Sequence, residues 1–428
     1  MKNILIIGNG FDLAHELPTN YTDFLKFIKV IRYQVFCENV ESVVTAWNDL
    51  NVDVKSAISS YQIRCSSSLE RMYKDLIEYN VWIDYFLQNS MYQKENWIDF
   101  ESEISRVVQS IDNDMKKFSA TESTIVRNIS ESFFATYFLD DIETRKQARD
   151  AEGLKLCKNM SVGKQSEFLE EYRRRHPVES LKNKITYKDL IMRLEKDLNR
   201  LIRALEIYLV DFVETMVISI ISNDIKNLEI DHVLNFNYTN TFEKLYGQEK
   251  NIEYDYIHGK ADIDNTTVTN NMVLGIDEYL SKKRRNKDIN FIAFKKYYQR
   301  IHKKTGSKYK EWLDKIIEDE NRKPWIINGK DCSKDYMHNL YIFGHSLDVT
   351  DKDILRDLIL HDNVHTTIFY YEENNDNGRT DLGKKIANLV KVIGQDELIK
   401  RTGGNTKTIE FKLQQDMMYI EDNCIESM

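Results

Sequence analysis

Met1-Lys-Asn-Ile4-Leu-Ile-Ile7-Gly8-Asn-Gly10-Phe-Asp12 opens the chain. Ile4 to Ile7 is a wholly apolar, mostly β-branched run, which predicts a strand buried on both faces. Gly8 and Gly10 follow directly, and a helix start is expected from Phe11 onward. A strand that turns through glycines into a helix presents free N–H groups and the helix dipole to an anion, so the turn indicates nucleotide binding. An ordinary tight turn is the alternative, because two glycines do not define a full dinucleotide fingerprint.

The composition is that of a soluble globular protein with a large core. Of the 428 residues, 42% are hydrophobic and 30% are charged, which allows two or three domains. The net charge of −9 provides no general attraction to nucleic acid or to anionic membranes. The Ile4–Ile7 run is too short for a signal peptide, and the apolar stretch 208–221 is too short to span a bilayer. The five cysteines are scattered with no Cys-x-x-Cys pair, so we expect no metal and a reducing, cytoplasmic location.

Helical and strand patterns occupy different parts of the chain. Between residues 31 and 227 helical spacing dominates, as in the leucine stripe from Leu190 to Leu205. After Leu228, short apolar runs alternate with helical patterns; the runs are 232–236, 272–274, 340–343, 366–371 and 408–411. This alternation predicts a parallel sheet flanked by helices, to which Ile4–Ile7 also belongs.

The predicted domain organisation is therefore discontinuous. We expect one α/β domain formed by residues 1–30 and 228–428. A helical insertion at 31–227 separates its first strand from the others. A second helical excursion at 278–338 interrupts the sheet again.

Small, amide and imidazole residues follow the predicted strands. In open parallel sheets, ligands bind beyond the carboxyl ends of the strands. The segments at these positions are 8–12, 237–240, 258–259, 275–277 and 344–348, with Asp351 close behind. Glycine and serine allow a ligand to approach the backbone, while asparagine and histidine supply hydrogen bonds. Together these segments predict a ligand site at one edge of the sheet.

These segments resemble the NAD-binding fold of sirtuins, which runs from a Gly-x-Gly turn through an Asn-Tyr-Asp box and a His-Gly pair to a Gly-x-Ser. The matching segments here are Gly8-Asn9-Gly10, Asn237-Tyr238-Thr239, His258-Gly259 and Gly344-His345-Ser346. The chain is more closely similar to the AbiH-type phage abortive-infection family. That similarity rests on residues 7–15, the Trp97-Ile-Asp-Phe-Glu101 box, Phe236-Asn-Tyr-Thr-Asn-Thr-Phe242 and Phe343-Gly-His-Ser-Leu347, and it spans nearly the whole chain.

The resemblance implies a sirtuin-like, Rossmann-type sheet and defence by NAD depletion. NAD would be the substrate, cut between nicotinamide and ribose. Asn237 and His258 match catalytic positions, so we expect His258 to be the base and Asn237 to position the water. The residues expected to contact the nucleotide are Gly8, Asn9, Gly10, Phe11, Asp12, Tyr238, Thr239, Gly344 and Ser346. Those expected beside or behind the site are His15, Asp99, Glu101, Asp277, His345 and Asp351.

Some residues depart from the sirtuin and dehydrogenase patterns. No Cys₄ zinc ribbon is present, which argues against protein deacylation. Thr239 replaces the final Asp of the Asn-Tyr-Asp box, and Leu13 replaces the third glycine of a dinucleotide fingerprint. Asp12 would repel a pyrophosphate unless it faces a ribose hydroxyl or caps the helix.

Two other function classes stay open. A non-catalytic sensor would bind NAD or ADP-ribose without turnover. A nuclease toxin would need paired carboxylates for metal ions, such as Asp277-Glu278 or Glu372-Glu373. The basic residues 282–285 and 295–296 are read as a solvated face, with Phe291, Phe294, Tyr298 and Ile301 packing inward, so nucleic acid is not expected as a partner. The expected partners are a nucleotide, a phage-derived trigger and further copies of the chain through the insertion, with no membrane.

Overall fold

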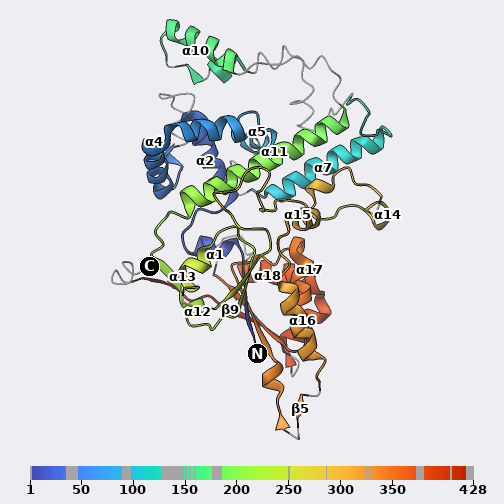
Figure 1. The fold of residues 1–428 in the computed structure, drawn as a ribbon. Coiled ribbons are helices and arrows are strands. Elements are labelled where there is room, and N and C mark those ends of the chain that lie inside the picture. Colours follow the sequence, from blue (N-terminus) through green and yellow to red (C-terminus); the bar gives the residue numbers. More distant parts are fainter. Residues whose placement is uncertain are drawn as a thin grey trace.

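The structure is a computed structural model that describes residues 2–34, 47–88, 98–126, 149–150, 152–154, 156–158, 160–175, 186–248, 251–285, 287–323, 325–327, 330–372, 380–404 and 407–420. It has two layers, an α/β layer and a block of helices above it (Figure 1). The N-terminal end of the chain lies at the edge of the sheet remote from the helical block. The helical block therefore covers the carboxyl ends of the strands.

Within the described residues, six parallel strands form the main sheet. They are β1 (Asn3–Ile7), β3 (His232–Asn235), β4 (Glu253–Tyr256), β7 (His338–Phe343), β8 (Val364–Tyr370) and β9 (Ile409–Leu413). Their order is β4-β3-β1-β7-β8-β9. Numbered along the chain, this is the 3-2-1-4-5-6 order of the Rossmann fold. The predicted parallel α/β sheet is confirmed, and β1 is its central strand.

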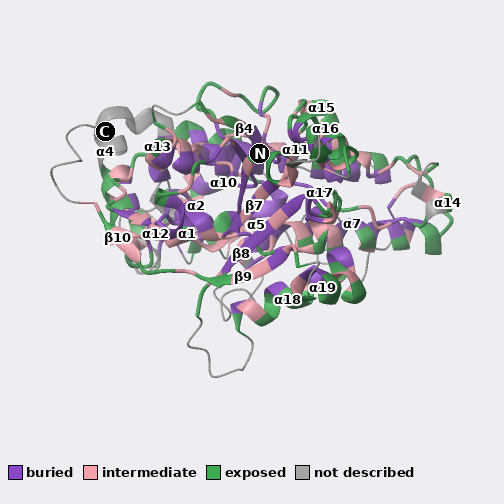
Figure 2. Cartoon of the chain, turned by 90° about the horizontal axis from the view of Figure 1, so that it is seen from below, coloured by how far each residue is buried: buried purple, intermediate pink, exposed green. Residues whose placement is uncertain are grey.

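Alternate residues of β1 pack on opposite faces of the sheet, as the two-residue period of a strand requires. Ile4 and Ile6 join a core with α16 (Tyr309–Glu320), α17 (Lys352–Ile359), α18 (Asp381–Ile393) and α19 (Gln395–Thr402). Leu5 and Ile7 join a second core with α1 (Asn9–Ala14), α12 (Asn223–Lys226) and α13 (Thr241–Tyr246). Figure 2 shows buried residues along the strands and exposed outer surfaces on α18 and α19.

The helical block has its own apolar core. Its elements are α2 (Tyr21–Gln34), α4 (Val52–Met72), η1 (Tyr73–Ile77), α5 (Val81–Gln88), α7 (Phe100–Lys117), α11 (Tyr187–Ile207) and η2 (Tyr208–Val213), while α10 (Val162–Arg175) lies at its outer end (Figure 1). The leucine stripe on α11 is buried as predicted. The same core includes Met272, Leu274 and Phe294, so the chain after β4 contributes to it.

The predicted strand at Met272–Leu274 is wrong. These residues are fully buried but lie outside any strand. The Gln299 side chain hydrogen-bonds both the N–H and the carbonyl of Leu274, at 3.0 and 3.1 Å. An amide side chain thus takes the place of a neighbouring strand, a substitution that an apolar run cannot reveal.

The excursion at 278–338 is not purely helical. It contains α14 (Lys282–Arg285), η3 (Ile292–Phe294), α15 (Lys296–Lys303), α16, the short hairpin of β5 (Ile326–Ile327) and β6 (Lys330–Asp331), and η4 (Ser333–Tyr336). After β7 the chain forms η5 (Val349–Asp351). A further antiparallel pair, β2 (Ile220–Ser222) with β10 (Met417–Tyr419), was not predicted from the sequence.

Candidate active site

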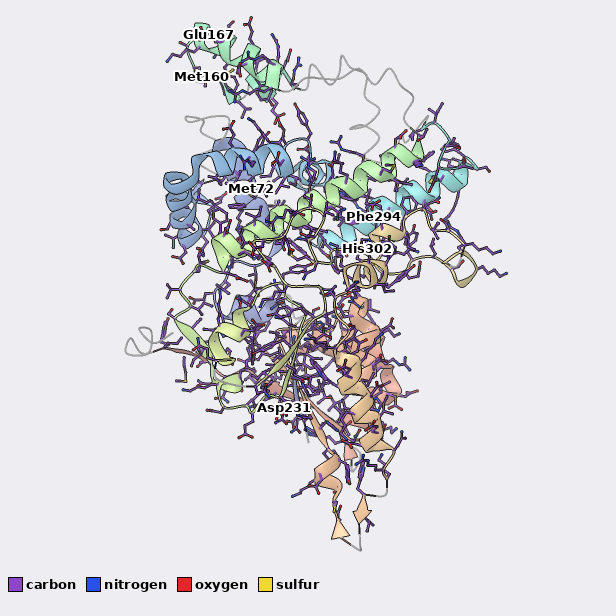
Figure 3. All side chains as sticks on the ribbon, in the orientation of Figure 1. Met72, Met160, Glu167, Asp231, Phe294 and His302 are labelled. Carbon is purple, nitrogen blue, oxygen red and sulfur yellow. The ribbon has the colours of Figure 1, made fainter. Side chains whose placement is uncertain are left out.

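The carboxyl ends of β1, β3, β4 and β7 lie side by side beneath the helical block. Gly8, Asn237, His258 and His345 follow these strands within two residues. We call this the carboxyl edge. The chain order reverses between β1 and β7, and open α/β sheets bind ligands at such a switch point. In Figure 3, Asp231 marks the opposite edge, whereas His302 on α15 and Phe294 lie near the helical block.

Asp351 is the centre of a polar cluster at the carboxyl edge. Its Oδ1 lies 3.6 Å from His258 Nε2, and its Oδ2 lies 3.6 Å from His345 Nε2. Lys296 Nζ and Arg300 Nη2 lie 3.8 and 3.7 Å from Oδ1. Burial alone would raise the pKa of Asp351, but Lys296 and the two imidazoles bring it well below its usual range. Asp351 is therefore a carboxylate at neutral pH.

His345 orients Asp351. Its Nδ1 accepts a hydrogen bond of 3.0 Å from the N–H of Leu347. A neutral imidazole that accepts at Nδ1 carries its proton on Nε2. The Nε2–H of His345 therefore faces the carboxylate of Asp351.

His258 is buried and has one unpaired ring nitrogen. Its Nε2 faces Asp351, while its Nδ1 has no hydrogen-bond partner. Phe236 contacts the rings of both His258 and His345 edge-on. Burial lowers the pKa of His258 to about 4, so the ring is neutral at pH 7. A carboxylate facing one ring nitrogen, with the other nitrogen unpaired, is the arrangement that orients a general base.

Lys296 connects the polar cluster to the helical block. Its Nζ lies 2.7 Å from Glu101 Oε2 in the first turn of α7. Burial raises the pKa of Glu101 to about 7, although Lys296 opposes this shift. Burial would lower the pKa of Lys296, but Glu101 and Asp351 outweigh it and raise that pKa. Lys296 thus pairs with carboxylates from both layers.

Arg300 lies one helical turn after Lys296 on α15. Its Nε and Nη2 are buried without a hydrogen-bond partner. Asp277 is exposed at the rim of the cluster, where partial desolvation raises its pKa to about 6 against the opposing effect of Lys296. The polar cluster therefore consists of Glu101, His258, Lys296, Arg300, His345 and Asp351, with Asp277 at its rim.

The glycine turn is packed against the loop that follows β7. A Cβ atom on Gly8 would lie 2.8 Å from His345 Cα, and one on Gly10 would lie 2.8 Å from the Gly344 carbonyl oxygen. The N–H of Gly10 donates to Gly344 O, and the N–H of Phe11 donates to Gly8 O, both at 2.8 Å. The expectation of free N–H groups at this turn is therefore wrong for these two. The glycines allow two backbone loops to touch at the switch point.

The side chains of the turn have different surroundings. Asn9 is exposed and accepts a hydrogen bond from the Thr19 hydroxyl at 2.7 Å. Phe11 is fully buried and packs on His15. His15 bonds the Phe11 carbonyl through Nδ1 and the Tyr246 hydroxyl through Nε2, both at 2.7 Å, and burial lowers its pKa to about 4. Phe11 and His15 therefore support the turn from the core behind it.

The loop after β3 is tied to the glycine turn. Asn237 Nδ2 donates to the Gly8 carbonyl at 3.0 Å. The Thr239 hydroxyl donates to Asp12 Oδ2 at 2.6 Å, and burial raises the pKa of Asp12 to about 6. Asp12 is 1% exposed, and its carboxylate points toward the loop after β3. Tyr238 donates its hydroxyl to the Val273 carbonyl at 2.8 Å.

Three other predicted residues have backbone roles. Asp99 caps α7 by accepting from the N–H of Glu101 at 3.0 Å, while Trp97 of the same box lies outside the described residues. Gly344 has φ +67°, a conformation that favours glycine. Ser346 is exposed, and its carbonyl accepts from Asn388 Nδ2 at 3.0 Å.

The sequence interpretation of α15 is corrected. Ile301, expected to pack inward, is 75% exposed, whereas Lys295 and Lys296 are 1% and 5% exposed. The lysines are buried because Glu278 and Glu101 pair with them. Lys296 and Arg300 were missed as site residues. Their four-residue spacing places them on one helix face, a signal that gains meaning only once Asp351 is known to lie opposite.

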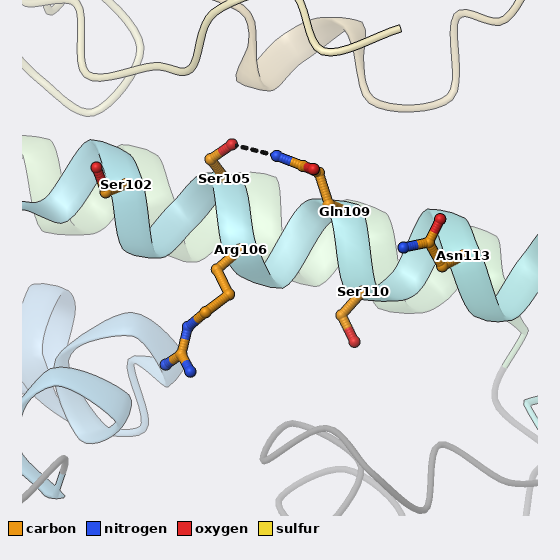
Figure 4. A pocket seen from close by; sticks show the side chains of 6 residues that line it. All are labelled: Ser102, Ser105, Arg106, Gln109, Ser110 and Asn113. Atoms are coloured by element: carbon orange, nitrogen blue, oxygen red, sulfur yellow. Dashed lines mark hydrogen bonds between the residues drawn. The ribbon is translucent and has the colours of Figure 1, made fainter.

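Neither a metal-binding group among the described residues nor the surface hollow on α7 provides a second candidate active site. Among the residues that the structure describes, no group of three His, Cys, Asp or Glu could hold a metal ion. The hollow is lined by Ser102, Ser105, Arg106, Gln109, Ser110 and Asn113 (Figure 4). Gln109 bonds Ser105 at 2.8 Å, and Arg106 is paired with Glu103. This lining contains no carboxylate, imidazole or thiol, so it offers no general base.

A family model, Bacteriophage abortive infection AbiH, matches residues 4–371. The chain belongs to the AbiH family. Membership assigns this AbiH protein to phage abortive infection. No curated protein and no solved structure matches the chain. No helix in the described part of the AbiH chain is long and apolar enough to cross a membrane.

Proposed function

We propose that this AbiH protein is an abortive-infection effector that hydrolyses NAD at the bond between nicotinamide and ribose. The observation that carries the proposal is the buried Asp351–His258 pair, with its unpaired Nδ1, at the switch point of a Rossmann-ordered sheet. The sirtuin-like segments after the strands support NAD as the substrate.

The reaction needs little general-acid catalysis, because nicotinamide leaves NAD as a neutral molecule. Water attacks C1′ of the ribose as the C1′–N bond breaks through an oxocarbenium-like state. The water proton passes to His258 Nδ1, and the products are nicotinamide and ADP-ribose. Asn237 donates through Nδ2 to the Gly8 carbonyl, so its Oδ1 is the atom that orients the water.

The direct test is release of nicotinamide from NAD by purified protein, with and without an extract of phage-infected cells. Wild type releases nicotinamide in at least one of these conditions. His258→Ala and Asp351→Asn lower the rate about 10²- to 10⁴-fold, because the base or its orientation is lost. His365→Ala is the matched control, since His365 lies partly exposed on β8 away from the carboxyl edge.

The outcomes separate hydrolysis from the sensor alternative. Full activity in His258→Ala rules out this residue as the base. NAD binding without nicotinamide release under either condition replaces the hydrolase by a nucleotide sensor.

A further inference from the structure

Arg300 presents an unsatisfied binding edge. In a guanidinium group, Nε–H and one Nη2–H point in the same direction and form a fork that matches two oxygens of a phosphate or carboxylate. These are the two Arg300 atoms that are buried without a hydrogen-bond partner. Leaving charged donors buried and unpaired is costly, so native proteins reserve such groups for a ligand or a specific strain.

Nearby acceptors are also unpaired. Asp351 Oδ1 lies 3.7 Å from Arg300 Nη2, beyond hydrogen-bond length, and has no hydrogen-bond partner. His258 Nδ1 is also unpaired, on the ring whose Nε2 faces the same carboxylate oxygen. The donors suit an anionic oxygen, and the carboxylate and imidazole acceptors suit hydroxyl groups.

The local charge permits an anion here. Glu101 is paired with Lys296 at 2.7 Å, so its charge is compensated. Asp351 has Lys296 and Arg300 within 4 Å of Oδ1 and His345 beside Oδ2. Asp277 lies at the rim, and its pKa of about 6 reduces its charge below neutral pH.

We propose that the Nε–Nη2 edge of Arg300 binds the phosphate of a phosphorylated ribose, whose hydroxyl groups face Asp351 and His258. The inference rests on the proposed function for the identity of the nucleotide, and it adds the substrate class that the site selects. Arg300 reaches the site from the excursion between the first and second halves of the sheet, so the excursion supplies specificity while the sheet supplies the base.

The test is direct binding, measured by calorimetry with ADP-ribose, ribose 5-phosphate and unphosphorylated ribose. ADP-ribose is the product of NAD hydrolysis, so binding is measured without turnover. Arg300→Gln weakens ADP-ribose binding about 10- to 100-fold, the range expected for loss of a charged hydrogen-bonded pair. Arg300→Lys keeps the charge but not the fork, so it retains an intermediate affinity. Arg356→Gln, an exposed arginine on α17, is the matched control and binds as wild type.

A measurement on unmutated protein guards against misfolded variants. Inorganic pyrophosphate displaces ADP-ribose from wild type if the fork binds phosphate. Equal ADP-ribose affinity in wild type and a folded Arg300→Gln, or no competition by pyrophosphate, overturns the inference. Failure of the proposed function looks different: ADP-ribose binds through Arg300, but no nicotinamide is released from NAD.

Discussion

Gly344 is the residue on which the contact between the glycine turn and the loop after β7 depends. Its φ is +67°, and a Cβ atom there would lie 2.1 Å from the Phe11 backbone nitrogen. Gly394 also has a positive φ, +91°, but with open space around its Cβ direction. Gly344→Ala therefore adds a backbone clash to the cost of a left-handed conformation, whereas Gly394→Ala has only the conformational cost.

We expect Gly394→Ala to lower the free energy of unfolding by about 1 kcal/mol and Gly344→Ala by about 3 kcal/mol or more. Urea denaturation of both variants measures the difference. Equal losses would mean that the two loops separate at little cost.

The buried His258 ring, with its unpaired Nδ1, predicts an unusual pH profile for NAD hydrolysis. The base must be neutral to accept a proton, and burial lowers its pKa to about 4 from the ordinary histidine value of 6.5. Activity that depends on His258 therefore persists as the pH falls through 6.5 and is lost near pH 4. The measurement is kcat/KM for NAD between pH 4 and 8.

Glu101→Gln separates a second titration from that of His258. Glu101 has a pKa of about 7, so any change in activity near neutral pH that it causes disappears in the variant. A limb near pH 6.5 that survives in a variant carrying both Glu101→Gln and Asp277→Asn would show that the His258 ring is solvated rather than buried, because Asp277 has a pKa of about 6.

Among single residues, the sequence predicted the position of those at strand ends better than the position of those on helices. Asn237, His258, His345 and Asp351 were located by the rule that ligands bind beyond parallel strands. Lys296 was read as part of a solvated basic run and Arg300 was not singled out, because their buried partners come from distant segments. A single sequence does not reveal that Glu101 on α7 faces Lys296 on α15.

Among the elements, β1 shows which strand signals are reliable. Ile4–Ile7 was predicted as a strand because both of its faces are apolar, and it is central to the sheet. Met272–Leu274 is likewise wholly apolar and is not a strand. Composition reports burial, whereas strand identity depends on which groups satisfy the backbone.

That distinction gives a prediction for α15. Gln299→Ala leaves the buried N–H and carbonyl of Leu274 without their partner, so we expect a loss of about 2–4 kcal/mol in the free energy of unfolding. Gln248→Ala is the matched control, because Gln248 is exposed and its side chain bonds the Lys244 carbonyl at 3.1 Å. Urea denaturation is the measurement, and equal loss in both variants would mean that water replaces the Gln299 contacts freely.

Over the whole molecule, a shared apolar core and a buried ion pair join the two layers. The helical core includes Leu274 and Phe294 from the chain after β4, and Lys296 pairs with Glu101 across the layers. The change from helical to strand pattern that predicts the large insertion could be seen in the sequence. The tight attachment of the insertion could not, because the attaching groups are single polar residues far apart in the chain.

Glu206 on α11 makes several of these attachments. It is 0% exposed and pairs with Arg203 at 2.6 Å, and it accepts from the Asp262 N–H at 3.0 Å and Asn265 Nδ2 at 2.7 Å. Residues 259–271, which follow His258 directly, are thereby held to the helical block. Glu206→Ala leaves the buried Arg203 without its carboxylate, so we expect a loss of about 3–5 kcal/mol.

The same helix offers the control, because Glu195 is exposed and Glu195→Ala should change the free energy of unfolding by about 0.5 kcal/mol or less. Hydrogen exchange adds the spatial test. In Glu206→Ala the amides of residues 259–271 should exchange faster while those of β1 and β7 stay protected, because the sheet keeps its own core. Unchanged exchange in this loop would mean that the helical block covers the carboxyl edge without holding it. A faster loop with reduced nicotinamide release would mean that the insertion fixes the position of the His258 ring.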